Sequence, residues 1–338
     1  MNIKEFSTRI GVSPTTTSSA ITGNGRISKA TRQMVLQKMR ELGYTPNLNA
    51  RRLVSGRSYM VALSHVDQKA ASDLFTMQVA RAIVGPLKEF GYDLWLNLAP
   101  DSMQEYSLLR QLVKSSTIDG TIIISDWSVP KKLLRDVASR NQPCVVIGEK
   151  LIDDIPFVGS VMLNLKPGAL EVARLFAAQG HKRIGFIDSD LRDRVFEYFA
   201  DALKKLGTPI NKKHYVAAGR DTEEGARALR RLMSQPNPPT AIFARTDVLA
   251  IGAIREARNM GLSIPQNLSV VGHDDLSILP LAEPGLTTVR IDCTELAKAA
   301  AEMLSGLLRN PDTDPEPKVI STSLVMRQTA APTPRAAD

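Results

Sequence analysis

A run of small hydroxylated side chains occupies the segment from Gly11 to Gly23, which reads GVSPTTTSSAITG. Serine and threonine hydroxyls both donate and accept hydrogen bonds, so on an exposed helix they can bind phosphate oxygens and the edges of nucleic-acid bases. The chemistry available to this segment is hydrogen bonding, and we expect it to form a short helix behind a tight turn.

The excess positive charge of the chain lies in the same region. Residues 1–58 contain 10 Lys+Arg and only two acids, Glu5 and Glu41, which gives a net charge of +8. The whole chain carries 43 − 35 = +8, so the other 280 residues hold 33 charges of each sign and sum to zero. A basic end on an otherwise balanced chain predicts a polyanionic partner.

A second set of candidate residues follows the apolar, strand-like runs farther along the chain. Ligands of doubly wound folds bind at the carboxyl ends of parallel strands, and a cleft between two such lobes is a natural site. Each of these side chains could instead cap a helix or face solvent. The candidates for a small-molecule site are Phe75, Thr76, Ser125, Asp126, Trp127, Arg192, Arg194, Thr246 and Asp247.

Residues for catalysis, metal binding or cofactor binding do not come together in any motif. The chain has no G-x-G-x-x-G after its first strand, no P-loop and no G-x-S-x-G turn, and its four histidines lack metal-ligand spacing. Cys144 and Cys293 stand in apolar surroundings and are predicted to be buried structural thiols. Asp274-Asp275, after a strand, fits an acid/base or metal pair or a turn and helix-capping device, and we favour the turn. We therefore predict no enzyme activity, no cofactor and no metal.

The bulk properties bound the class of protein. A length of 338 residues indicates about two or three domains, and 43% apolar with 23% charged residues is typical of globular protein. No apolar run reaches the roughly 18 residues needed to cross a bilayer, and the N-terminus lacks the apolar core of a signal peptide. We expect a cytoplasmic protein.

Three short helices are expected to position the hydroxylated segment. Apolar spacing predicts a helix over 3–9, and Gly11-Val12 makes a turn before a second helix that Ser13 caps and that ends near Ile21. Ser28 caps a third helix, about 29–42. This arrangement fits a DNA-binding helix-turn-helix over residues 1–45 or an ordinary three-helix bundle, and the charge favours DNA. Residues 46–58 form a basic hinge that is either a plain linker or a short helix.

From Tyr59 onward, strand-like runs alternate with amphipathic helices in two successive series. Alternation of this length predicts parallel sheets covered by helices on both faces. We expect a two-lobed domain over 59–330, with one lobe of about 59–160 plus 291–326 and the other of about 161–290. A last helix, about 293–309, and a final strand, about 319–326, should return to the first lobe, and 331–338 should form a disordered tail.

The chain resembles the LacI/GalR family of bacterial transcriptional regulators. Residues 3–58, which begin IKEFSTRIGVSPTTTSSAITGNGRIS, look like the headpiece and hinge of that family almost without gaps. Farther along, the effector-domain signatures of the family are matched by QGHKRIGFID, ARTDVLAIGAIREARNMGLSIPQNLSVVGHDDL and EPGLTTVRID. The resemblance covers essentially the whole chain. It implies a helix-turn-helix headpiece joined to two periplasmic-binding-protein-like lobes, in a homodimer that binds palindromic double-stranded DNA under control of a small effector such as a sugar.

The resemblance also carries roles onto individual positions. The second helix would read bases and the hinge would wedge Leu53 into the minor groove at the operator centre, with Ala50 and Arg51 on the same hinge. The base-reading positions fall on Pro14, Thr15 and Ser19, with Thr16 beside them. The DNA-backbone positions fall on Ser18, Thr22, Ser28, Thr31, Tyr44 and Asn47. The implied effector-binding residues are Phe75, Thr76, Asp126, Arg194 and Asp247.

Departures from the family pattern limit what can be transferred. The family often has arginine at the position of Ser19 and valine at that of Thr17, and losing a long donor removes a base contact worth about 1–3 kcal/mol of discrimination. The operator sequence is therefore not implied. In the effector cleft, a sugar-gripping arginine aligns with Val195, beside Arg194, and an asparagine aligns with Thr246, while Asp247 is kept.

Two further departures concern the same cleft. Asp221 stands where some members have a stacking aromatic residue, and an Asp-Asn pair of the family reads Leu163-Asn164. Two other classes of protein remain open at this point: a solute-binding protein of the periplasmic type, and an enzyme on a doubly wound fold. Neither would need the basic headpiece, and neither predicts DNA binding that falls steeply with salt.

Overall fold

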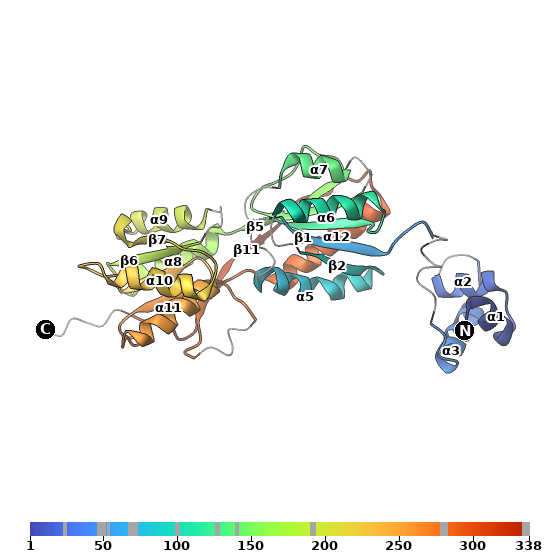
Figure 1. Ribbon diagram of the computed structural model, residues 1–338, viewed down its shortest axis with the longest axis horizontal. Helices are drawn as coiled ribbons and strands as arrows, with labels where there is room; N and C mark the ends of the chain where they lie inside the picture. The colour runs from blue at the N-terminus through green and yellow to red at the C-terminus, as the bar shows by residue number, and fades with distance from the viewer. Residues whose placement is uncertain are drawn as a thin grey trace. The chain divides into compact units, whose positions relative to one another are not determined.

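The computed structural model describes residues 1–22, 26–45, 52, 55–66, 74–98, 102–125, 129–138, 142–189, 194–277 and 283–332. It divides into two compact units, residues 1–58 and 59–338, and each is described by itself (Figure 1). We call the first unit the headpiece. The second contains two α/β lobes.

The headpiece has three helices, α1 (Ile3–Ile10), α2 (Pro14–Thr22) and α3 (Lys29–Glu41). Asn2 and Glu5 form a reciprocal capping box at the start of α1, and Gly11 ends that helix with φ = 73°, a conformation that favours glycine. Ser13 and Ser28 cap α2 and α3 through their hydroxyl oxygens, which accept the amides of Thr16 and Thr31 at 3.0 Å. The predicted helix-turn-helix arrangement is confirmed.

One small core holds the three helices together. Phe6 from α1, Ala20 from α2 and Val35 from α3 are fully buried, and Tyr44 after α3 closes the cluster. The rings of Phe6 and Tyr44 are stacked, with centroids 4.2 Å apart and an interplanar angle of 12°. A core of this size leaves the first residues of α2, Pro14 and Thr15, exposed at the surface.

Lobe 1 is built on a six-stranded sheet in the order β11-β5-β4-β3-β1-β2, and all its strand pairs are parallel. Side chains alternate between its two faces: Val61 and Leu63 pack with α5 and α12, whereas Ala62 packs with α6 and α7. Its strands are β1 (Met60–His65), β2 (Asp93–Asn97), β3 (Gly120–Ile124), β4 (Cys144–Gly148), β5 (Val158–Asn164) and β11 (Lys318–Ser321), and its helices are α5 (Leu74–Glu89), α6 (Ser102–Lys114), α7 (Lys131–Ala138) and α12 (Cys293–Arg309).

Lobe 2 has a second six-stranded sheet, in the order β12-β10-β9-β8-β6-β7, parallel except for the β10–β12 pair. Buried aromatic rings, Phe176, Phe186, Phe199 and Phe243, fill the side under α8 and α9. Its strands are β6 (Ile184–Asp188), β7 (Tyr215–Ala217), β8 (Ala241–Ala244), β9 (Ser269–Asp274), β10 (Thr287–Arg290) and β12 (Ser323–Val325), and its helices are α8 (Lys166–Ala178), α9 (Val195–Lys205), α10 (Thr222–Met233) and α11 (Asp247–Asn259).

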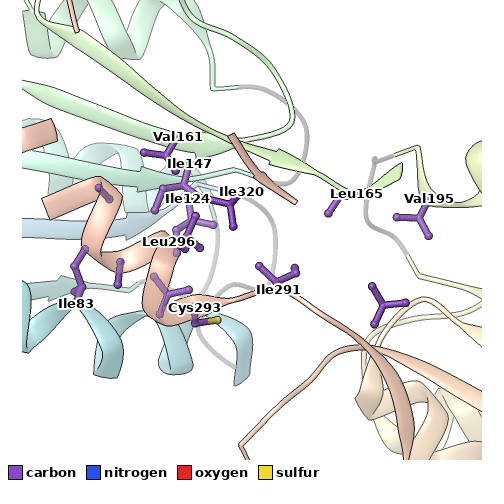
Figure 2. Close-up of a cluster of buried hydrophobic side chains, with 14 of the residues drawn as sticks. Ile83, Ile124, Ile147, Val161, Leu165, Val195, Ile291, Cys293, Leu296 and Ile320 are labelled. Atoms are coloured by element: carbon purple, nitrogen blue, oxygen red, sulfur yellow. The ribbon is translucent and has the colours of Figure 1, made fainter. Parts of the chain in front are cut away.

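The chain passes between the lobes three times: after β5, after β10 and between β11 and β12. Leu165 and Ile291, at two of these crossings, continue the buried cluster of lobe 1 towards Val195 in lobe 2 (Figure 2). The predicted single closing strand is wrong, because Thr322 divides it into β11 in lobe 1 and β12 in lobe 2. Two strands beside the crossings, β5 and β10, are not predicted by the sequence pattern.

Candidate nucleic-acid interface and effector site

Helix α2 presents its first residues to solvent. Pro14 and Thr15 are exposed, and Thr16 is half-buried with its hydroxyl 2.8 Å from that of Ser13. Ser18 and Ser19, one turn farther on, are also half-buried. The exposed start of α2 is therefore a surface of short hydrogen-bonding groups, as the sequence predicts. The side chain of Thr22 falls outside the described residues.

Thr17 has a different role from its neighbours. Its side chain is fully buried, and its hydroxyl lies 2.7 Å from the hydroxyl of Ser7, which is fully buried in α1. The threonine in place of the valine often found in the family is therefore matched by a polar partner inside the core. This departure concerns the packing of α1 on α2, whereas Ser19 lies on the face of α2 that is predicted to contact bases.

The remaining headpiece candidates lie at the ends of α3. The hydroxyls of Ser28 and Thr31 are 2.8 Å apart at its N-terminus, where main-chain amides attract anions. Tyr44 belongs to the core and is only 7% exposed, and burial raises the pKa of its phenol. Four hinge candidates lie outside the described residues: Asn47, Ala50, Arg51 and Leu53.

Among the described residues of the headpiece, most cations have no acidic partner. Lys38 pairs with Glu41 at 2.7 Å, and hydrogen bonds from Lys38 and Gln37 lower the pKa of that carboxyl. Within the part of the chain that the structure describes, no carboxylate oxygen lies within 4.0 Å of a side-chain nitrogen of Lys4, Arg9, Arg26, Lys29, Arg32 or Arg40. Their charge remains available to an external polyanion.

In lobe 1, the floor of the candidate effector site is formed where β1 ends. His65 is fully buried, and its Nδ1 lies 2.5 Å from the hydroxyl of Thr76 in the first turn of α5. The buried carboxylate of Glu105 accepts the amide of His65 at 2.6 Å and the hydroxyl of Ser64 at 2.7 Å. These bonds hold the polar end of β1 against α5 and α6.

In lobe 2, three charged or titratable residues meet at the ends of β8 and β9. We call these residues, Arg245, His273 and Asp274, the polar floor of lobe 2. The Nη1 of Arg245 donates to Nδ1 of His273 at 3.2 Å, and Oδ1 of Asp274 lies 3.0 Å from the same ring nitrogen. Arg245 and Asp274 are themselves 3.7 Å apart. All three are at most 8% exposed, so the cluster offers donors and an acceptor in a site with little bulk water.

Asp247 lies beside this cluster, fully buried at the start of α11. Its Oδ2 accepts the amide of Leu276 at 2.8 Å, and its Oδ1 accepts the hydroxyl of Thr288 at 2.5 Å. Burial, followed by the nearby charge of Asp274, raises the pKa of the Asp247 carboxyl well above its ordinary value. Because both oxygens bind the protein, the geometry assigns Asp247 to holding the turn after β9, with Thr246 as the helix cap.

The other sequence candidates occupy separate places. Phe75 is half-buried and packs between the hydrophobic clusters of the two lobes. Arg194 is exposed, with its guanidinium 5.0 Å from the ring centroid of Tyr198 on α9. Asp126 lies outside the described residues. The structure thus places Thr76 and Asp247 at the polar strand ends and directs Arg194 onto a helix surface.

Sequence reasoning missed His65, Arg245 and His273 as members of the candidate effector site, and favoured a turn role for Asp274. Each stands at or just after the carboxyl end of a strand, in β1, β8 and β9, and this position was the available signal. Asp274 and Asp275 do adopt positive φ values, 112° and 54°, so the predicted turn is present.

Metal-ligand clusters and membrane-spanning helices are both absent from the described residues. Within the described ranges, no group of three or more His, Cys, Asp or Glu side chains is placed to hold a metal ion. Among the same residues, no helix combines the length and the apolar composition that a bilayer span requires. Cys144 and Cys293 are free, buried thiols, and burial raises the pKa of each to about 12.

The chain is similar to known regulators over nearly its full length. The family model described as "Bacterial regulatory proteins, lacI family" matches residues 2–47, and "Periplasmic binding protein-like domain" matches residues 173–330. A probable HTH-type transcriptional repressor from Bacillus subtilis, ExuR, is 28% identical, with 97% of each chain covered. The HTH-type transcriptional repressor CytR of Escherichia coli is 26% identical, with coverage of 96% of this chain and 95% of CytR.

Solved structures agree on the fold. The lac repressor dimer bound to operator and the anti-inducer ONPF matches with a TM-score of 0.77 at 21% identity, covering 98% of this chain and 99% of that one. The CelR–cellobiose complex matches with a TM-score of 0.71 at 24% identity, covering 98% and 100%. With its helix-turn-helix headpiece and two doubly wound lobes, the chain belongs to the LacI family of bacterial regulatory proteins, which are DNA-binding transcriptional regulators and not enzymes.

Proposed function

We propose that this LacI-family protein is a cytoplasmic, homodimeric repressor that binds a palindromic operator and responds to a small polar metabolite held between its lobes. The observation that carries the proposal is the headpiece. Its second helix exposes Pro14 and Thr15, on a unit that contains the whole excess of +8. A solute-binding protein or an enzyme has no need of either feature.

DNA contact would use the surface that α2 and the start of α3 provide. Hydroxyl groups at the start of α2 would lie against base edges, while the capped N-terminus of α3 and the unpaired cations would hold phosphates. Leu53 would enter the minor groove from the hinge, as the family resemblance implies. Two headpieces would then bind half-sites about 10 base pairs apart, centre to centre.

A second copy of this chain would pack on the edge of lobe 1. Strand β2 is an edge strand and carries Trp95, which is 42% exposed. Leu74, Met77 and Val84 lie along α5, which packs beside β2, and are 40–46% exposed. An open strand edge next to an apolar helix stripe is a surface that favours pairing with another chain. This surface supports a homodimer through lobe 1, the lobe that follows the hinge.

The effector is proposed to be neutral and rich in hydroxyls, such as a sugar. In the polar floor of lobe 2, the charge of Arg245 is offset by Asp274, and His273 lies between them. A charge-balanced set of buried donors and acceptors favours a ligand that offers both without a net charge. Cellobiose in the CelR complex is a ligand of this kind, bound to a protein of the same fold.

Control of DNA binding would follow from the orientation of the two lobes. A ligand in the cleft shifts the lobes towards the orientation it binds more tightly. Because lobe 1 carries the hinges in the dimer, that shift changes the spacing of the headpieces and hence operator affinity, with a coupling of about 1–3 kcal/mol.

The test is selection of duplexes from a random pool by the full chain, followed by affinity measurements over a range of salt concentrations. We expect a palindromic consensus and an affinity that falls steeply with salt. The chain from Tyr59 to Asp338 is the control and should select nothing. Equal binding to all duplexes, or selection by the shortened chain, would contradict the proposal. A thermal-shift screen of metabolites on the same shortened chain then identifies the effector.

A further inference from the structure

The turn after β9 joins the polar floor of lobe 2 to lobe 1. It begins with Asp274 and Asp275, both at positive φ, and continues through Leu276 and Ser277. Its first residue, Asp274, contacts His273 in the floor, and the amide of Leu276 donates to Asp247 at 2.8 Å. A change in the floor is therefore transmitted directly to the backbone of this turn.

The turn is also fixed to the body of lobe 2. The carboxylate of Asp275 binds Arg290 at the end of β10 through Nε, and Arg327 after β12 through Nη2, each at 2.6 Å. Asp275 is buried by these two guanidinium groups, and its side chain is only 9% exposed. Charge-assisted bonds of this length resist displacement, so the turn moves with lobe 2 as one piece.

Gln78, on α5 of lobe 1, makes hydrogen bonds with the other side of this turn. Its Oε1 accepts the amide of Ser277 at 2.7 Å, and its Nε2 donates to the carbonyl of Asp275 at 3.2 Å. The same Nε2 lies 3.4 Å from Sγ of Cys293, the first residue of α12. The side-chain amide of Gln78 thus connects the two lobes. It binds two main-chain groups of the turn, the carbonyl of Asp275 and the amide of Ser277.

We propose that Gln78 is the positioning residue through which the floor of lobe 2 sets the orientation of lobe 1. The inference rests on the proposed DNA-binding function and names a residue that carries its regulation. The path runs from His273 and Asp274 through Leu276 and Ser277 to Gln78 and along α5. Only a side chain of this length that both accepts and donates a hydrogen bond satisfies the amide of Ser277 and the carbonyl of Asp275 together.

Residues near Gln78 connect α5 both to the end of β1 and to the proposed dimer surface. Thr76, two residues before Gln78, binds His65 at the end of β1. Leu74, Met77 and Val84, also on α5, belong to the proposed dimer surface. A shift of the turn that pulls on Gln78 therefore displaces the helix that carries the dimer contacts. The packed core under α5, with Val79 and Ile83 fully buried, makes the helix move as a rigid element.

The first arm of the test measures hydrogen exchange of single main-chain amides in the full chain without DNA. Gln78→Met keeps the length of the side chain and removes both polar groups, and it should speed exchange at Ser277 by about three- to tenfold. Gln111→Met, an exposed glutamine on α6 of the same lobe, is the matched control and should change nothing. Unchanged protection of Ser277 in Gln78→Met would overturn the contact itself.

The second arm adds the palindromic duplex selected by the wild-type protein and follows the amide of Leu276, which binds Asp247 and makes no bond with Gln78. By reciprocity, DNA that senses the turn must also act on it. In the wild type and in Gln111→Met, the duplex should change exchange at Leu276 by about threefold or more. In Gln78→Met, the protein should still bind the duplex, but this change should be lost.

The two arms separate failure of the inference from failure of the proposed function. A wild-type protein that selects no duplex contradicts DNA-binding regulation, and the first arm still decides whether Gln78 holds the turn. A duplex-induced change at Leu276 that persists in Gln78→Met would show that coupling takes another route. Gln78→Glu adds a check, because it keeps the acceptor for the amide of Ser277 and loses the donor to the carbonyl of Asp275, so the amide of Ser277 should stay protected.

Discussion

The hydroxyls of Ser7 and Thr17 lie 2.7 Å apart in the interior of the headpiece, with both side chains fully buried. Each hydroxyl provides the partner that the other needs away from water. The pair connects α1 to α2, the helix that we propose to enter the major groove. Its integrity therefore fixes the angle at which the base-contacting residues are presented.

Replacement of one member of this pair should cost more than replacement of both. Thr17→Val leaves the hydroxyl of Ser7 buried without that partner and should lower the unfolding free energy of the headpiece by about 1–3 kcal/mol. Ser7→Ala together with Thr17→Val should be close to neutral. Native-state hydrogen exchange of α1 amides in the full chain measures both. Additive losses in the double variant would contradict the pairing.

The hinge leucine should separate specific from non-specific binding. Leu53→Ala should weaken binding to the selected palindrome by about tenfold or more and leave binding to random duplex largely unchanged, because only the specific complex opens a base step. Arg52→Ala is the comparison, since loss of one phosphate contact should lower the salt slope by about one unit. Equal losses on both duplexes after Leu53→Ala would remove the wedge role.

Asp247 should make stability depend on pH. Its folded-state pKa is raised, chiefly by burial, so the folded protein binds a proton more tightly than the unfolded chain does. The associated stability is present below the ordinary value of 3.8 and is lost as pH rises through the raised pKa. Asp247→Asn, in which the hydroxyl of Thr288 can turn to accept, should abolish this part of the pH dependence. Denaturant unfolding from pH 4 upward measures the difference.

Removal of the Asp247 side chain has a different consequence. Asp247→Ala leaves the amide of Leu276 and the hydroxyl of Thr288 without their buried acceptor, which should destabilise the fold by about 2–4 kcal/mol and release the turn after β9. Because the released turn no longer holds its position after β9, the response to the effector should also be lost. A normal thermal shift on adding the metabolite found by the screen would contradict this role.

The proposed dimer surface should be sensitive to a single buried charge. Trp95→Glu should raise the dimer dissociation constant by about thirtyfold or more, because a large aromatic residue at an interface core is replaced by a carboxylate. Leu206→Glu is the matched control, since Leu206 is 44% exposed against 42% for Trp95 and lies after α9 in lobe 2. Sedimentation velocity distinguishes monomer from dimer, and an unchanged constant for Trp95→Glu would place the interface elsewhere.

Both cysteines should be unreactive in the folded protein. Burial raises the pKa of the Cys144 and Cys293 thiols to about 12, so almost none of either is thiolate at neutral pH. We expect a disulfide reagent to react with almost no thiol in the native chain and with both thiols after denaturation. Rapid reaction of one thiol before unfolding would show that its surroundings open.

Much of the fold follows from local pattern. The glycine and serine signals at Gly11, Ser13 and Ser28 predict the helix boundaries of the headpiece, because caps are local hydrogen-bonding requirements. The alternation of apolar runs and amphipathic helices predicts both sheets. The strands at 158–164 and 287–290 were not predicted because glycine or hydroxylated residues interrupt them, Gly159 and Ser160 in the first and Thr287 and Thr288 in the second. Neither strand therefore has the apolar run that marks a buried strand.

The site was harder to predict than the fold. Its residues come from strands far apart in the sequence, and a side chain such as His273 or Arg245 is marked only by its place at the carboxyl end of a strand, which does not show what it contacts. Asp247 was correctly placed at a helix start, but its partners, Leu276 and Thr288, lie 29 and 41 residues away and could not be read from spacing. Gln78 had no signal at all, since the two main-chain groups that it binds, in Asp275 and Ser277, belong to the other lobe.

The three crossings between the lobes also determine the order in which the protein can be completed during synthesis. Neither lobe is one continuous stretch of chain, because β11 closes the edge of one sheet and β12 that of the other, and both come from the last part of the sequence. Thr329 then binds both Val270 and Thr287 across lobe 2. A growing chain can fold its headpiece before the lobes are made, but it must expose an incomplete edge on each lobe until residues 318–325 have been made. The two lobes should therefore reach their native state together, and a small deletion near residue 320 should unfold both.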